Sequence, residues 1–238
     1  MTLHFRNRFG RAVLPLLAAL VLFAAVCCPA QQSYIGKYDA YVGFSDINAP
    51  FVNNLNQPGF NTQVGISTNR WLASGFDFSK ETGTGPLTAN LLPANLQQEL
   101  AAELPPGYTL SIPTDVTIQT FAGGSQLVYR HFSKATILIH PALCAVRVSA
   151  TPHPTDPIST AVVAVLVPSG KKLDWTGGYG IGGGVELRVS KHLSARMQTD
   201  AIWTHPINDI LANGGWIYRF SVGPAFHFGR NIANGKAR

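Results

Sequence analysis

The chain has 238 residues, of which 46% are apolar and only 13% are charged. So low a charge with so high an apolar content excludes an intrinsically disordered protein. Three cysteines are too few for a disulfide framework or a four-thiolate zinc site. Half of the net charge of +6 comes from Arg6, Arg8 and Arg11. The other basic residues form no patch interleaved with aromatics, so the sequence predicts no nucleic-acid partner.

The first thirty residues have the layout of a secretory signal peptide. Residues 1–11 carry three arginines and no acid, and residues 12–26 form an uninterrupted apolar run. Ala30 then offers the small residue that a cleavage site requires. The apolar run is shorter than the about 20 residues of a membrane-spanning helix. We therefore expect residues 1–30 to be cleaved on export.

A lipoprotein signal is the alternative interpretation of this segment. It would use Cys27 or Cys28 as the acylated residue, but Val26 and Cys27 are poor residues immediately before such a cysteine. We expect the mature chain to begin with a short segment, residues 31–37, and to have no helical membrane anchor.

From residue 38 onward, apolar and polar residues alternate with period two, which is the period of β-strands. The longest case runs from Asp174 to Val189 without a phase error. The alternation predicts eight strands, at residues 38–45, 60–67, 72–78, 114–130, 135–148, 174–189, 193–203 and 216–228. In the two less regular strands, Gly123-Gly124 predicts a bulge and Pro141 an interruption.

The connections between these strands are alternately long and short. The long ones are residues 47–58, 81–113, 149–172 and 204–214. Alternating connections describe an all-β protein, an eight-stranded antiparallel up-and-down barrel over residues 38–228. Loops 81–113 and 149–172 exceed the usual length of structureless connections, which indicates either a function or disorder. Asn95–Leu104 has helix-forming composition.

The direction in which the apolar face of the barrel points indicates whether water or lipid surrounds it. One set of alternate residues holds nearly all the Trp, Phe, Tyr, Val and Leu, and the other is rich in Gly, Ser, Asn and Gln. Small and charged residues fit a narrow lumen, so we expect the apolar set to face lipid. The predicted lumen charge network is Asp77, Glu186, Arg188, Arg196, Asp200 and Arg219. The predicted aromatic girdle is Trp175, Trp203 and Trp216.

The charged lumen set has two interpretations. The interior of an eight-stranded barrel is only wide enough for side chains to fill it, which favours a plug of paired charges. A narrow ion-conducting path is the alternative. The short turn at Ser190–His192 pairs Val189 with Leu193, and this register places Glu186 directly opposite Arg196.

The last strand carries the most specific motif. Residues 221–228 read Ser-Val-Gly-Pro-Ala-Phe-His-Phe, with a polar residue first, glycine third and aromatics sixth and eighth. With the signal peptide and the eight alternating strands, the chain resembles the small outer-membrane β-barrel proteins of Gram-negative bacteria, of the OmpA-type transmembrane domain. The resemblance implies that the barrel-assembly machinery reads an insertion signal at Ser221, Gly223, Phe226 and Phe228.

The resemblance also implies a place in the cell envelope. The barrel would lie in the outer membrane, in contact with the lipid bilayer and lipopolysaccharide, with its long loops outside the cell. Residues 229–238 would then be a short periplasmic tail. We expect a monomer without cofactors that has a structural or surface-interaction role, with loops 81–113 and 149–172 binding an extracellular partner or simply shielding the membrane.

Catalytic motifs are weak. His131 and Ser133 lie close together, but on a tight turn without a neighbouring carboxylate. A barrel enzyme that modifies lipid A or phospholipid is therefore the alternative, and no catalytic residues are assigned. The Gly180–Gly184 segment lacks the helix and the Lys-Ser/Thr pair of a phosphate loop. The histidines do not have metal-ligand spacing, so no metal site is expected.

Overall fold

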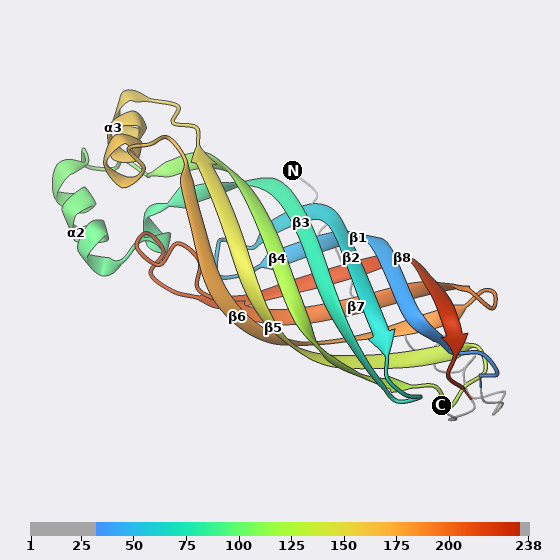
Figure 1. Cartoon of the computed structure of the whole chain (residues 1–238). Helices are drawn as coiled ribbons and strands as arrows, with labels where there is room; N and C mark the ends of the chain where they lie inside the picture. The colour runs from blue at the N-terminus through green and yellow to red at the C-terminus, as the bar shows by residue number, and fades with distance from the viewer. Residues whose placement is uncertain (1–31, 234–238) are drawn as a thin grey trace, which may run out of the picture.

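A computed structural model of the chain describes residues 32–233 and shows a closed barrel of eight antiparallel strands (Figure 1). Each strand pairs with its neighbours in sequence, and the first strand pairs with the last. The predicted fold class is confirmed. The predicted signal peptide, residues 1–30, lies outside the described residues, as does the end of the tail, residues 234–238.

The strands are β1 (Gly36–Ala49), β2 (Leu55–Ser67), β3 (Leu72–Thr88), β4 (Ser111–Tyr129), β5 (Ala135–Pro152), β6 (Lys172–Arg188), β7 (Leu193–Thr204) and β8 (Gly215–Asn231). The helical elements are η1 (Ala89–Leu91), α2 (Ala94–Glu103) and α3 (Pro157–Leu166). Both α-helices lie at the end of the barrel opposite the short turns (Figure 1). Among the described helices, none has the length and apolar character needed to cross a membrane.

The strands extend into all four of the predicted long loops, 47–58, 81–113, 149–172 and 204–214. The observed connections on that side are residues 50–54, 89–110, 153–171 and 205–214. The first is a tight turn in which Asn53 and Asn54 adopt the left-handed conformation, with φ of 51° and 54°. The predicted strands ended too early because the prediction required the outward residues of every strand to be apolar, and most outward residues at this end are polar.

The predicted bulge at Gly123-Gly124 is wrong. β4 pairs with β3 in one register along its whole length, and Gly123 lies opposite Phe76 while Gly124 lies opposite Gly75. The strand looked irregular because Ile118 and other apolar residues near its first end point into the barrel.

The predicted interruption at Pro141 is also wrong, because β5 continues through it with its ladder to β6 intact. Proline has no N–H to donate, so Pro141 leaves a ladder hydrogen bond unmade, and the affected ladder is the one to β4. The ladder between β4 and β5 has a gap between the pairs Gly123–Leu143 and Leu127–Ile139, opposite Pro141.

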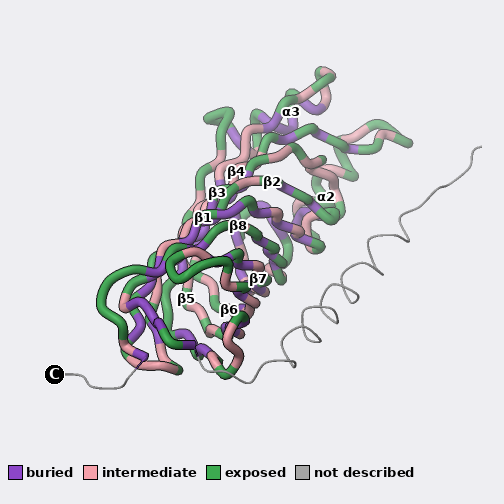
Figure 2. Tube along the Cα trace, turned by 90° about the vertical axis from the view of Figure 1, so that its right-hand side faces the viewer, coloured by how far each residue is buried: buried purple, intermediate pink, exposed green. Residues whose placement is uncertain are grey.

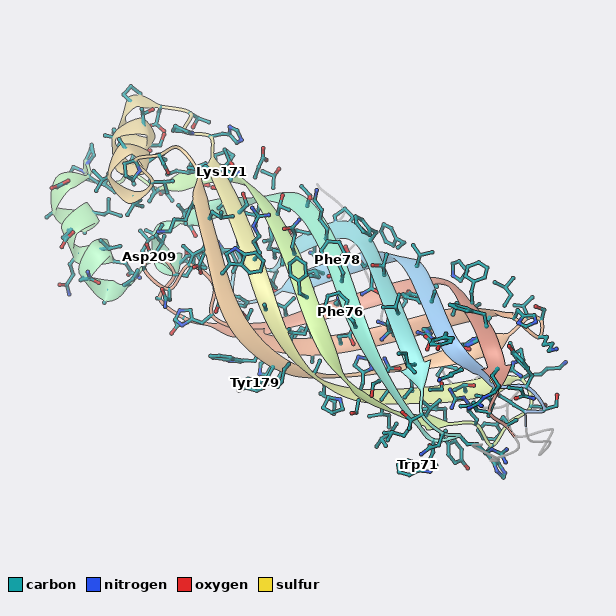
Figure 3. All side chains as sticks on the ribbon, in the orientation of Figure 1. Trp71, Phe76, Phe78, Lys171, Tyr179 and Asp209 are labelled. Carbon is teal, nitrogen blue, oxygen red and sulfur yellow. The ribbon has the colours of Figure 1, made fainter. Side chains whose placement is uncertain are left out.

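In the part of the barrel nearest the short turns, apolar side chains cover the outside and most inward side chains are polar, apart from a small buried apolar cluster of Ala73, Val128 and Leu138. On β4, the outward residues of this part run from Phe121 to Tyr129 and include Ser125 as their one polar side chain. This span is close to the about 9–11 residues that a strand needs to cross a bilayer. Phe76 and Tyr179 point away from the barrel in Figure 3 and are 50% and 53% exposed.

Toward the helices, the two faces exchange polarity. The first outward residues beyond the apolar band on three neighbouring strands are Lys80, Gln119 and Arg147, which lie side by side in the ladder. On β4 and β5, apolar inward residues begin at this level, and Ile118, Val146 and Val148 are almost completely buried. The expectation that the apolar set faces outward everywhere is therefore wrong for this end of the barrel.

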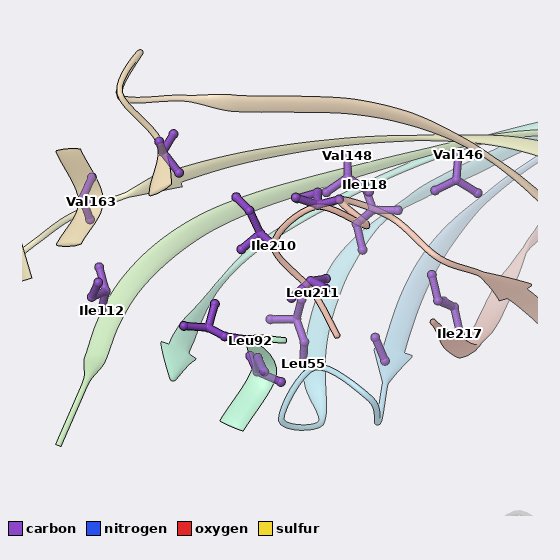
Figure 4. Close-up of a cluster of buried hydrophobic side chains, with 14 of the residues drawn as sticks. Leu55, Leu92, Ile112, Ile118, Val146, Val148, Val163, Ile210, Leu211 and Ile217 are labelled. Carbon is purple, nitrogen blue, oxygen red and sulfur yellow. The ribbon is translucent and has the colours of Figure 1, made fainter. Parts of the chain in front are cut away.

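The inward apolar residues pack against the helices and loops that cover this end (Figure 4). Figure 2 shows buried stretches of chain in the strands and beside α3. The buried core consists of Ile47, Ala49, Leu55, Leu91, Leu92, Leu110, Ile112, Ile118, Val146, Val148, Val162, Val163, Val167, Ile207, Ile210, Leu211 and Ile217. The covering segments, residues 89–110, 153–171 and 205–214, are called the cap below. The barrel thus contains a polar lumen at one end and an ordinary apolar core at the other.

The helix expected at Asn95–Leu104 is confirmed as α2, whereas α3 was not predicted. α3 begins with a capping box, in which the Asp156 carboxylate accepts a hydrogen bond from the Ser159 backbone N–H (2.9 Å) and Ser159 Oγ accepts one from the Asp156 N–H (3.1 Å). Pro157 occupies the first helical position, where its missing N–H costs nothing.

Asp156 also connects two parts of the cap. Tyr108 Oη donates a hydrogen bond to its carboxylate (2.9 Å). Hydrogen bonds from Ser159, chiefly from its backbone N–H, hold the pKa of Asp156 below its ordinary value. A carboxyl with a lowered folded-state pKa stabilises the fold above its unfolded pKa of about 3.9, and this stabilisation is lost as the pH falls through the folded value.

We predict that Asp156→Ala increases amide hydrogen exchange in the first turn of α3 at neutral pH, because the Ser159 N–H loses its acceptor. Asp156→Asn should preserve the protection, since asparagine also caps helices. After correction for intrinsic exchange rates, the wild type should lose protection below about pH 4, and the Asn variant should not. Wild-type protection in the Ala variant would contradict this role of the cap residue.

Candidate functional site

Eight ionisable side chains of the lumen form two clusters. The Arg196 cluster contains Asp39, Glu186, Arg196 and His227, and the Arg219 cluster contains Asp77, His140, Asp200 and Arg219. Each cluster combines one arginine, two carboxylates and one histidine. Each is therefore electrically neutral when its histidine carries a proton.

The Arg196 cluster lies nearer the short turns. Nη2 of Arg196 lies 2.9 Å from Glu186 Oε2 and 3.0 Å from Asp39 Oδ2. Nε of the same guanidinium donates to Glu186 Oε2 (3.1 Å), and Nη1 donates to Gln63 Oε1 (2.5 Å). His227 Nε2 lies 2.5 Å from the other Glu186 oxygen. The guanidinium thus joins acceptors from β1, β2 and β6 across the barrel.

The Arg219 cluster lies nearer the apolar core. Nε and Nη2 of Arg219 donate to Asp200 Oδ2 at 3.0 and 2.8 Å, and Nη1 lies 2.7 Å from Asp77 Oδ1. His140 Nε2 contacts the second Asp200 oxygen at 2.9 Å. Asn61 Nδ2 donates to Asp77 Oδ2 (2.7 Å). Hydrogen bonds of this kind offset the cost of burying the charges.

The ladder register brings the charged pairs together. Glu186 lies directly opposite Arg196 in the pairing of β6 with β7, as the turn at residues 190–192 predicted. Asp200 lies opposite Arg219 in the pairing of β7 with β8. Side chains at such positions are about 5 Å apart at Cβ, so the backbone register itself holds each pair in contact.

Arg188, from the predicted network, forms its hydrogen bond elsewhere. Its Nη2 donates to Gln32 Oε1 (3.0 Å), and Gln32 Nε2 donates to Thr136 Oγ1 (2.8 Å). Gln32 is buried across the mouth of the barrel at the short-turn end. The strand phase placed Arg188 on the correct face, but it could not show that the N-terminal segment folds over this mouth.

Sequence reasoning missed several lumen residues. Asp39, His140 and His227 occupy inward positions of their strands but were not assigned to the network. Glu81 was placed in a loop, yet it lies inside β3 with no exposed surface. It accepts hydrogen bonds from Ser45 Oγ (2.7 Å) and from Ser79. The regular alternation of β1 and β8 could have assigned Asp39 and His227 to the inward face. The irregular sequence of β5 did not allow the same assignment for His140.

Side chains leave little space in the lumen at the level of the clusters. The cavity beside Arg219 measures about 20 Å³ and the one beside Arg196 about 10 Å³. A cavity of that size holds about one water molecule. Both guanidinium groups are buried, with 2% of the side chain exposed.

The three predicted girdle tryptophans all lie on the outward face. Trp175 stacks on Phe121, with ring centroids 5.6 Å apart. Trp203 lies opposite Trp216 in the ladder and stacks on Tyr179 at 5.6 Å. A second group of outward aromatics, which the sequence analysis did not assign, lies near the short turns and includes Trp71 (Figure 3).

The predicted insertion motif lies on β8, where the barrel closes. Phe226 and Phe228 face outward and are 48% and 49% exposed, and Phe228 stacks on Tyr38 of β1 at 5.7 Å. Gly223 faces inward against β1, where a Cβ would come within 2.9 Å of the carbonyl carbon of Val42. Any side chain there would push the two closing strands apart.

The residues of the enzyme alternative lie at the turn between β4 and β5. The His131 ring stacks on Tyr129 (5.8 Å) and packs edge-on against Phe132 (5.6 Å). Aromatic packing therefore accounts for the position of this histidine. Within residues 32–233, no group of three His, Cys, Asp or Glu side chains is arranged to hold a metal ion.

We predict that Glu186→Ala and Arg196→Ala each lower the free energy of unfolding in urea, by up to about 3–5 kcal/mol for a buried partner left unpaired. Arg196→Ala should cost more, because it leaves both Asp39 and Glu186 without their guanidinium. The double variant should lose less than the sum, with a coupling of about 0.5–3 kcal/mol.

Arg147→Ala is the control. Its guanidinium faces outward and bonds Gln119 Oε1 (2.9 Å), and it shares no hydrogen-bond partner with Arg196. Combining it with Arg196→Ala should therefore give additive losses. Additive losses for the Glu186–Arg196 pair would show instead that the observed contact contributes nothing to stability.

Comparisons with known proteins give structural similarity only. No family model and no curated protein matches the sequence. Neisserial surface protein A is 12% identical, with a TM-score of 0.53 over 81% of this chain and 97% of that one. The attachment invasion locus protein of Yersinia pestis is 9% identical, with a TM-score of 0.48 over 82% and 99%. The N-terminal β-barrel domain of Pseudomonas aeruginosa OprF is 10% identical, with a TM-score of 0.36 over 82% and 99%. The likeness to the Neisserial protein shows a shared eight-stranded barrel fold.

Proposed function

We propose that the protein is a non-enzymatic outer-membrane β-barrel whose cap forms a rigid interaction surface outside the cell. The observation that carries this proposal is the exchange of polarity along the barrel. Below the level of Lys80, Gln119 and Arg147, the outside is apolar and the inside is charged. Above that level, the arrangement is that of a water-soluble barrel.

A bilayer accounts for the lower part. Exposed apolar side chains cover it in a band, far beyond the few hundred Å² that monomers in water usually expose. Aromatic residues border the band at both ends, with Trp175 and Trp216 on the cap side and Trp71 near the short turns. Such paired girdles mark the two interfaces of a membrane barrel.

Three features support the outer membrane. The first thirty residues read as an export signal, closed barrels of this type are outer-membrane structures, and the fold is shared with a surface protein. We infer that the assembly machinery recognises β8 through Ser221, Gly223, Phe226 and Phe228. The bilayer and lipopolysaccharide then surround the apolar band.

The cap has the order that a recognition surface needs. Lys172 at the start of β6 forms an ion pair with Asp209, and Asp174 accepts a hydrogen bond from the Ile207 N–H (2.6 Å). Tyr108 joins Asp156 across the cap. Ordered loops lose little conformational entropy on binding, so a partner outside the cell is recognised at lower cost.

We predict that the cap is outside the cell and the short turns are periplasmic. In a Cys144→Ala background, single cysteines at Ala101 of α2 and Ala161 of α3 should react with a membrane-impermeant maleimide on intact cells. A cysteine at Lys134, in the β4–β5 turn, should react only after the outer membrane is permeabilised. All three positions are exposed, so accessibility of the side chain does not limit labelling.

The same cells provide the controls for location. The protein should fractionate with the outer membrane and migrate differently in a gel before and after boiling, as closed barrels do. Labelling at Lys134 alone would reverse the topology, and recovery in the soluble fraction would contradict the membrane assignment.

We further propose that the charge clusters and the apolar core beneath the cap close the lumen to ions at two successive levels, and we predict no stable open level in planar-bilayer recordings of the wild type. Arg196→Ala combined with Arg219→Ala removes the two largest buried side chains of the lumen but leaves the apolar core in place, so this double variant should also show no stable open level. Arg188→Ala should remain silent, since its guanidinium lies outside both clusters. A steady open channel in the wild type would favour the narrow-pore alternative.

A further inference from the structure

A cavity of about 90 Å³ lies inside the apolar core at the cap end of the barrel. Its walls come from strands, a turn and the cap, through Phe51, Leu91, Ile118, Val148, Leu211 and Ile217. Four of these side chains are labelled in the close-up of the core, where they come from different segments (Figure 4). We propose that this cavity is a binding site for a small, uncharged apolar molecule of about the size of benzene.

The polar groups of the lining determine the charge of the ligand. Thr114 and Lys172 are the lining residues with polar side-chain atoms. Thr114 Oγ1 donates to the Ile112 carbonyl (3.1 Å), and the Lys172 ammonium is paired with Asp209. The walls therefore offer a ligand neither a free charge nor a free hydrogen-bonding side chain. A polar molecule would lose its hydrogen bonds to water there without replacement, whereas a hydrocarbon loses none.

The volume limits the size of the ligand. An apolar protein cavity of about 150 Å³ lined by Leu, Ile and Phe binds benzene or xenon. At about 90 Å³, the present cavity admits a single small ring or a short alkane, and a lipid with its head group does not fit. The site thus differs from the interaction surface proposed for the cap, which faces outward.

The lining also extends from the buried core toward the surface. It extends from Ile217, which is 2% exposed, to the half-buried Phe51 and Val52 in the turn between β1 and β2. The Phe51 ring packs over Gly215, where a Cβ would lie only 2.6 Å from two ring carbons. The lining thus reaches partly exposed residues at the cap end of the barrel, which are Phe51, Val52, Pro86 and Lys172.

Two alanines on β5 provide a matched pair of substitutions. Ala150 faces inward and lines the cavity, so Ala150→Leu fills part of its volume. Ala145 lies on the outward face of the same strand and is exposed. Ala145→Leu adds the same side chain to the apolar band without changing the cavity.

The test uses the full mature chain in lipid nanodiscs, which avoids competition from detergent tails, with ¹³C-labelled methyl groups and benzene as the probe. The methyl groups of Ile118 and Ile217 report on the cavity. Those of Ile139 and Ile181, which are exposed on the outward face, report benzene dissolved in the bilayer. We expect the cavity signals to shift to a plateau, while the outward signals shift linearly with benzene concentration.

Ala150→Leu should abolish the plateau, and Ala145→Leu should preserve it. Ile118→Ala provides a second test if the leucine variant does not fold, because a larger cavity should add saturable binding of propylbenzene. Linear shifts at all four positions would overturn the proposal, as would an unchanged plateau in Ala150→Leu. Either result would leave the membrane topology and the surface role of the cap unaffected, because those rest on separate measurements.

Discussion

The pairing of β8 with β1 closes the hydrogen-bonded ladder, and a closed ladder leaves no strand edge whose N–H and C=O groups require water. Since the backbone is satisfied wherever the barrel lies, the side chains alone determine which medium suits each level. Outward residues near the short turns are apolar, and outward residues near the cap are polar. The same strands are therefore suited to lipid near the short turns and to water near the cap.

The interior follows the same division. Where the outside is apolar, the apolar side chains face lipid and most inward side chains are polar. There, two arginines that each bind two carboxylates hold the inside together. Where the outside is polar, Ile118, Val148 and Ile217 pack inward beneath the cap. Glu81, bonded to two serines, lies between the ionic and apolar layers. Neither layer can extend into the other, because an arginine in the apolar core would lack its acceptors.

Period two was sufficient to predict the eight strands, their antiparallel order and the contact between Glu186 and Arg196, because these depend on local alternation and turn length. It was not sufficient at the cap end. There, residues still alternate between the inward and outward faces of the barrel, but the inward face is apolar and the outward face is polar. Ile217, an apolar residue on a polar face, was the visible sign of that reversal. The roles of His140 and of Gln32 at the barrel mouth depend on contacts between distant strands, which one sequence cannot show. The capping box of α3 was readable from Asp156, Pro157 and Ser159.

The level at which polarity reverses is encoded by side chains and not by the backbone. The ladder runs unbroken from Phe78–Phe121 to Lys80–Gln119, so nothing in the strand geometry fixes the upper edge of the band. Replacing one outward pair with apolar residues would raise that edge by one step of the alternation, and the reverse exchange would lower it. Mismatch with bilayer thickness costs fractions of a kcal/mol per Å. A lineage could therefore adapt this barrel to thicker or thinner membranes by a few substitutions, without insertions, deletions or a change of strand number.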